Sequence, residues 1–161
     1  MEITLSYNTL YQQVERSLSI IGKRSRDDNG SLLFTDITLG SREKEIINDY
    51  FRQAIIDLSV ELSAFIVGEN DANGTMTISL ELPTNHNEHL ETFIQKTCEA
   101  YCVSYALQSW FTVTAPRLAE KSAADCVRMT GAIIRLVNNK QAPDVSDGMD
   151  IMAPASAVEQ S

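Results

Sequence analysis

Apolar residues along this chain recur mostly at the spacing of α-helices. The longest such run extends from Ser41 to Val67 and ends at Gly68. Its apolar positions fall every three or four residues, so they would form one face of a helix about 40 Å long. These positions are Ile47, Phe51, Ile55, Leu58, Leu62 and Phe65. The pattern therefore predicts one long amphipathic helix.

Three further runs predict three more helices, each with a recognisable start. Ser6 can cap the first of them, and Asn85 followed by Glu88 resembles a capping box at the start of the second. Thr114 followed by Pro116 marks the start of the last one. The three helices are expected from Ser6 to Gly22, from Asn85 to Phe111 and from Pro116 to Val137.

A short stretch between the two longest helices has the period of a strand. Residues 68–74 read as a polar loop, and apolar and polar residues then alternate over Thr75–Leu82. A single strand leaves its backbone groups unpaired, so this one needs a partner. The partner could be Leu32–Leu39, which is rich in residues that favour extended structure, or a strand of another subunit.

These patterns predict a mainly α protein, a helical bundle of about four helices with a small β element, a strand or a hairpin, between the long helices. Residues 1–140 would form a single helical domain with this β element. Residues 141–161 hold four acids and no Lys or Arg and lack periodicity, which predicts a flexible acidic tail. The first residues lack the pattern of a signal peptide, and no apolar run is long enough for a membrane helix, so we expect a cytoplasmic start and no membrane association.

Charge is unevenly distributed along the chain, whose formal net charge is −9. The segment from Arg42 to Thr112 has four bases and eleven acids, whereas the segment from Arg117 to Lys140 has five bases and two acids. In the second segment, three bases seven residues apart would form a basic stripe on one helix face: Lys121, Arg128 and Arg135.

This basic stripe has three readings. It could be an ordinary polar face, it could contact the DNA backbone, or it could meet the acidic face of a neighbouring copy in a head-to-tail contact. Under the last reading we expect an oligomer interface that contains Lys121, Arg128, Arg135, Glu45, Asp49, Thr77 and Ser79.

Residues capable of catalysis or metal binding are few in this sequence. His86 and His89 share a predicted helix start, but no third ligand accompanies them. Cys98 and Cys102 lie one helical turn apart and could join Cys126 in a thiolate site, although the simpler interpretation is that all three are buried small hydrophobes. Glycine-rich phosphate loops and nucleophile elbows are absent. We therefore expect no enzyme activity, no metal and no cofactor.

The order of the elements and a few short strings give a resemblance to a known class of proteins. The strings are Phe34–Leu39, the strand Thr75–Leu82 after the long helix, and Trp110–Pro116 at the opening of the last helix. In these features the chain looks like small prophage-encoded structural proteins of gut Bacteroidetes. By architecture it also resembles the head–tail connector (adaptor) proteins of tailed phages, over residues 1–140.

The resemblance implies a structural virion component that assembles as a ring below the portal and extends the DNA channel. Its partners would be copies of itself and portal or tail proteins, with DNA passing through an acidic channel that repels it. Its location would be the virion, after assembly in the cytoplasm of the bacterial host. The alternative function is a helical protein-binding or regulatory module that acts as a small oligomer.

Overall fold

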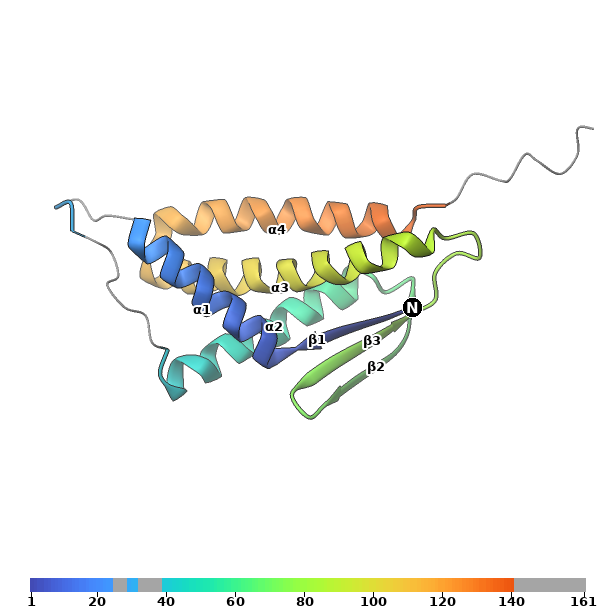
Figure 1. Cartoon of the computed structure of the whole chain (residues 1–161), viewed down its shortest axis with the longest axis horizontal. Helices are drawn as coiled ribbons and strands as arrows, with labels where there is room; N and C mark the ends of the chain where they lie inside the picture. Colours follow the sequence, from blue (N-terminus) through green and yellow to red (C-terminus); the bar gives the residue numbers. More distant parts are fainter. Residues whose placement is uncertain (25–28, 32–38, 141–161) are drawn as a thin grey trace, which may run out of the picture.

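The computed structural model describes residues 1–24, 29–31 and 39–140 (Figure 1). Four long helices and a small antiparallel sheet make up these residues, so the predicted fold class is confirmed. The predicted tail, residues 141–161, and most of Leu32–Leu39 lie outside the described part. The elements are β1 (Glu2–Ser6), α1 (Tyr7–Arg24), α2 (Ser41–Glu61), β2 (Ile66–Ala72), β3 (Thr75–Leu80), the short 3₁₀ helix η1 (Glu88–Leu90), α3 (Glu91–Thr114) and α4 (Pro116–Val137).

Helix α3 is the central helix, because it packs against α1, α2, α4 and β1. In Figure 1, α4 runs along the upper edge of the molecule and the sheet lies below α3. Apolar side chains cover more than one side of α3, as expected for a helix with neighbours in several directions. Its buried residues are Ile94, Cys98, Tyr101, Cys102, Val103, Ala106, Leu107 and Phe111.

Helix α4 folds back along α3 after a single residue between them, Ala115. Pro116 occupies the first turn of α4, where its missing N–H costs no helical hydrogen bond, so the predicted start is confirmed. The inner face of α4 buries Cys126, Ile133 and Val137. Its opposite face is left toward solvent.

Strand β3 lies in the middle of the sheet and pairs with β1 on one side and with β2 on the other, both antiparallel. The predicted need for a partner is therefore met within the chain. The partners are not the ones expected: both edges of β3 are filled by β1 and β2, not by Leu32–Leu39 or by another subunit. The alternation predicted for Thr75–Leu82 is confirmed as far as Leu80, and the side chains of β3 that face the helices are buried: Met76, Ile78 and Leu80.

Two segments differ from the prediction because strand pairing overrides the local pattern. Helix α2 ends at Glu61 and not at Val67, and the Phe65 N–H donates to the Leu62 carbonyl (2.8 Å) in the turn that follows. Ile66 then pairs with Leu80 of β3. The expected polar loop 68–74 is instead most of β2 and its turn.

The turn between β2 and β3 consists of Asn73 and Gly74, whose φ angles are 54° and 73°. Two successive positive φ values belong to the tight turn that matches the twist of a hairpin, and Asn-Gly is its preferred sequence. A β-carbon at Gly74 would meet no atom within 4 Å, so the backbone angle alone explains this glycine.

The outer edge of β1 is bonded at its middle residue, Thr4, by a side chain of α3. The Thr4 N–H donates to Oε1 of Gln95 (2.9 Å), and Nε2 of Gln95 donates to the Thr4 carbonyl (2.7 Å). One amide therefore replaces the two hydrogen bonds that a further strand would make there. It also ties the sheet to the central helix.

We expect Gln95→Met to lower the free energy of unfolding by about 1 kcal/mol, because it removes two hydrogen bonds to a strand edge that water only partly replaces. Chemical denaturation measures the change. The matched control is Gln12→Met, at an exposed position of α1. Equal stabilities of the two variants would contradict the role assigned to Gln95.

Candidate interaction surfaces

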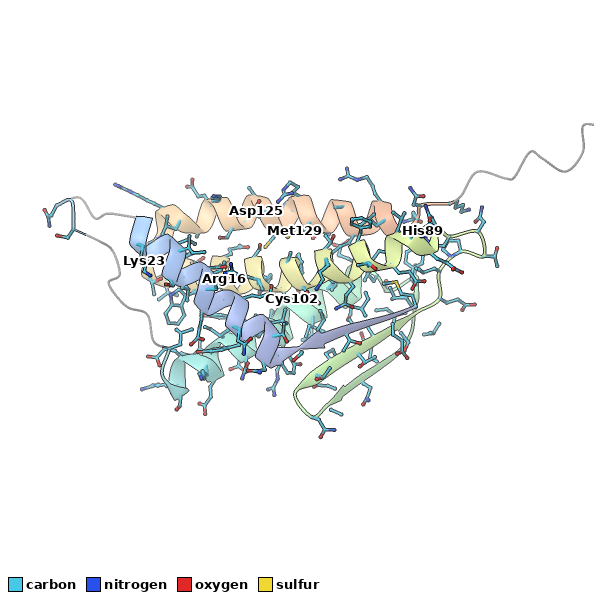
Figure 2. The ribbon with its side chains drawn as sticks, in the orientation of Figure 1. Arg16, Lys23, His89, Cys102, Asp125 and Met129 are labelled. Atoms are coloured by element: carbon cyan, nitrogen blue, oxygen red, sulfur yellow. The ribbon has the colours of Figure 1, made fainter. Side chains whose placement is uncertain are left out.

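The three cysteines are free thiols in the core, as the sequence predicts. Burial raises the pKa of Cys98 to about 12 and that of Cys126 to about 11, and it also raises the pKa of Cys102. A protonated thiol is a poor nucleophile and a poor metal ligand. Cys102 lies on α3 inside the bundle in Figure 2. In the described part of the chain, no group of three His, Cys, Asp or Glu side chains is arranged to hold a metal ion.

The two histidines differ in burial and in the hydrogen bonds that they make. His86 is buried, and its Nδ1 lies 3.1 Å from the carbonyl oxygen of Asn139, so it links the loop before η1 to the end of α4. His89 is exposed in η1, and its backbone N–H donates to Oδ1 of Asn87 (3.1 Å). The cap is therefore Asn87 and not Asn85 as predicted.

The basic stripe predicted from the sequence lies on the surface of the protein. Lys121, Arg128 and Arg135 are all exposed on the outer face of α4. Arg128 lies 3.0 Å from Asp125 of the same helix, an exposed ion pair that contributes little to stability. Figure 2 shows Asp125 on α4, along the upper edge of the molecule.

Apolar residues accompany this stripe. Ala124 and Val127 are exposed beside it, and Val127 is 76% exposed. Gly131 follows one turn later, and a β-carbon there would meet nothing within 4 Å. We call the set Lys121, Ala124, Val127, Arg128, Gly131 and Arg135 the α4 face.

The predicted acidic residues Glu45 and Asp49 are exposed on α2. Positions 45, 49, 52, 56 and 60 are three or four apart, so these side chains form one outer row along α2. Within the row Asp49 lies 3.8 Å from Arg52, in a weak exposed pair. The row ends in two apolar residues, Ile56 and Val60, which are 55% and 67% exposed.

A groove of about 470 Å³ lies beside the end of this row, between α2 and the β2–β3 hairpin. Ser59 donates to Glu69 across it (2.5 Å), which fixes the hairpin against the helix. The groove is lined by Ile55, Ile56, Ser59, Val60, Ser63, Ile66, Glu69 and Met76. We call the outer row of α2 and this groove together the α2–hairpin face.

Sequence reasoning missed the apolar half of the α2–hairpin face. It assigned one apolar stripe to the helix and treated the rest of the surface as polar. The signal was present, because Ile56 and Val60 are four residues apart and both lie off the core stripe. The groove itself had no signal, since its second wall is the hairpin that was read as a loop.

The residues around the hairpin are more strongly acidic than the whole segment from Arg42 to Thr112, which contains four bases. Residues 53–95 contain no Lys or Arg. They contain seven acids: Asp57, Glu61, Glu69, Asp71, Glu81, Glu88 and Glu91. This part of the molecule is thus uniformly acidic, whereas the α4 face is mainly basic.

The seven residues predicted for the interface occupy three separate places in the protomer. Three lie on α4 and two on α2, while Thr77 and Ser79 are half-buried on β3, alternating with its buried residues. Since β3 has strands on both sides, Thr77 and Ser79 could contact a neighbour only through their side chains. The interface itself stays a prediction.

Comparison with protein families, with curated proteins and with solved structures finds no match. None of the described helices has the length and apolar character needed to cross a bilayer.

We expect the folded protein to lose stability as the pH rises from about 9 to about 12, the window between the ordinary and raised thiol pKa values. Above pH 9 the unfolded chain releases thiol protons that the folded chain retains, so ionisation favours unfolding. Denaturant titrations at several alkaline pH values measure the slope, and Cys98→Ala should make it shallower. An unchanged slope in Cys98→Ala would contradict the raised pKa of this thiol.

Proposed function

We propose that this chain is a structural protein that assembles head to tail into a ring, in the manner of a head–tail connector of a tailed phage. The observation that carries the proposal is the separation of two unlike surfaces on one protomer. One is the α4 face, which is mainly basic, and the other is the α2–hairpin face, which is apolar and acidic.

These two surfaces lie on different helices of the protomer. Helices α2 and α4 both pack against α3 (Figure 1). They also contact each other, and Val127 and Gly131 of α4 line one hollow with Glu61 of α2. A contact between unlike surfaces repeats from copy to copy, and it closes into a ring when the rotation between copies divides a full turn and involves no translation along the ring axis.

Charge favours the head-to-tail orientation, in which the α4 face of one copy meets the α2–hairpin face of the next, over contacts between like faces. A basic face attracts an acidic one, and two copies that approach by like faces repel each other. Pairing of faces leaves the total charge unchanged, so an assembled ring still carries a formal charge of −9 for each copy. An acidic ring suits a channel through which DNA slides without binding.

Native mass spectrometry and electron microscopy of the full chain test the proposal. We expect a single closed ring at micromolar concentration, and a shift toward single protomers as salt rises, because screening weakens contacts between exposed charges. A dimer that no concentration enlarges would favour the alternative, a small protein-binding module. A protein that stays monomeric at every concentration would contradict assembly altogether.

A further inference from the structure

We propose that the α4 face of one copy docks on the α2–hairpin face of the next copy, with the helices lying along each other. This inference rests on the proposed function and specifies its contact. It follows from three properties of the two faces: their exposed apolar residues, their charges and their shape.

Both faces expose large apolar side chains. Val127 on the α4 face is 76% exposed, and Val60 and Ile56 on the other face are 67% and 55% exposed. Water-exposed apolar surface of this kind, surrounded by charged residues, is typical of a contact surface. Docking would place Val127 over the groove beside Ile56 and Val60 and remove all three from water.

The charges of the two faces are opposite in sign but differ in extent. The bases Lys121, Arg128 and Arg135 span fifteen residues of α4, about 21 Å from first to last. The acids Glu45 and Asp49 lie one turn apart, about 6 Å, at the start of a row on α2 that ends in the apolar Val60. This whole row is about 22 Å long, so the two helices can lie along each other.

The acids available to the basic stripe are Glu45 and Asp49 on α2 and Glu69 on β2. Each face also has an internal pair, Arg128 with Asp125 and Arg52 with Asp49. Exposed pairs of this kind exchange partners at little cost, so they do not prevent contacts between copies. The contact would be charged at the Glu45 end of the α2 row and apolar at the Val60 end.

The α4 face is also shaped for close approach. Nothing in the protomer packs against the position of a β-carbon at Gly131, although glycine is unfavourable inside a helix. Ala124 lies on the same face. Small residues here let a second helix lie near the backbone of α4.

The edges of the sheet suit assembly less well. Gln95 already occupies the outward-facing backbone groups of Thr4 in the middle of β1. Strand β2 has an irregular register between Ile66 and Gly68 and carries Glu69 and Asp71, features that discourage the addition of a strand. The contact between copies is therefore assigned to side-chain faces.

Two double variants with opposite charge changes test this contact. The donor variant is Lys121→Glu with Arg128→Glu, which makes both faces acidic. The acceptor variant is Glu45→Lys with Asp49→Lys, which makes both faces basic. We expect each variant alone to need about a hundredfold higher concentration to assemble than the unmodified chain, because like charges then face each other.

An equimolar mixture of the two variants should assemble again, since each variant supplies the face that the other lacks. The matched control is Arg16→Glu with Lys23→Glu, which makes the same charge change at exposed positions of α1, labelled in Figure 2. This control should assemble like the unmodified chain. Circular dichroism verifies that all variants are folded.

The outcomes separate the contact from the function. If the unmodified chain forms rings and the donor and acceptor variants do so equally well, this contact is wrong and the proposed function stands. If both variants fail and their mixture also fails, the contact is likewise wrong. If the unmodified chain never assembles, the proposed function and the contact both fall.

A second pair of variants tests whether the exposed apolar residue Val60 is part of the contact. Val60→Ser should weaken assembly about tenfold, because it removes a side chain that docking buries. Val113→Ser is the control: Val113 is 78% exposed near the end of α3, outside both faces. Equal weakening by the two changes would overturn the placement of Val60 in the contact.

Discussion

The pairing of β3 on both sides within one chain is the constraint on which the rest of the structure depends. It brings Glu2–Ser6 next to a hairpin more than sixty residues away and places Ile3 opposite Ile78 on the core side of the sheet. It ends α2 at Glu61, because Ile66 is needed beside Leu80. It also fills both edges of the strand whose partner was expected to be Leu32–Leu39 or a strand of another subunit.

This internal pairing determines which surfaces remain for contacts with other molecules. Gln95 occupies the outer edge of β1 at Thr4, and β3 has strands on both sides, so copies of the chain would recognise each other through side chains and not through backbone hydrogen bonds. The hairpin supplies the second wall of the groove beside Ile56 and Val60. The strand pairing that ends α2 early thus also makes the α2–hairpin face.

The sequence predicted features that depend on local periodicity and failed where distant segments compete for the chain. The helical spacing gave the core positions of α2, since Ile47, Phe51 and Leu58 are buried as expected. Pro116 correctly marked the start of α4. These signals lie within a few residues of the structure that they predict, so no knowledge of distant contacts is needed.

Strands β1 and β2 were missed for two different reasons. Ile3 and Leu5 alternate with polar residues, but two apolar positions are a weak signal beside a long helix that follows at once. In β2 only Ile66 and Val67 are large apolar residues, and the acids and glycine after them are typical of a loop. The Asn73-Gly74 turn was the usable signal for a hairpin, and it was read as part of that loop.

The charged surfaces were partly predictable. The stripe of Lys121, Arg128 and Arg135 followed from a seven-residue repeat, and its exposure agrees with that prediction. That these residues lie on two separate helices packed against α3 required the tertiary structure. The sequence could therefore name candidate residues but could not assign them to two separate surfaces.

Zero-length cross-linking of amines to carboxylates, in a mixture of unlabelled and ¹⁵N-labelled protein, tests the central claim most directly. Lys121 lies on α4 and the two acids lie on α2, and the isotope mixture distinguishes links between copies from links within one copy. We expect mixed-isotope cross-links from Lys121 to Glu45 or Asp49 of another copy. Cross-links from Lys121 that stay within one isotope, or that join it only to residues outside the α2–hairpin face, would contradict the head-to-tail contact.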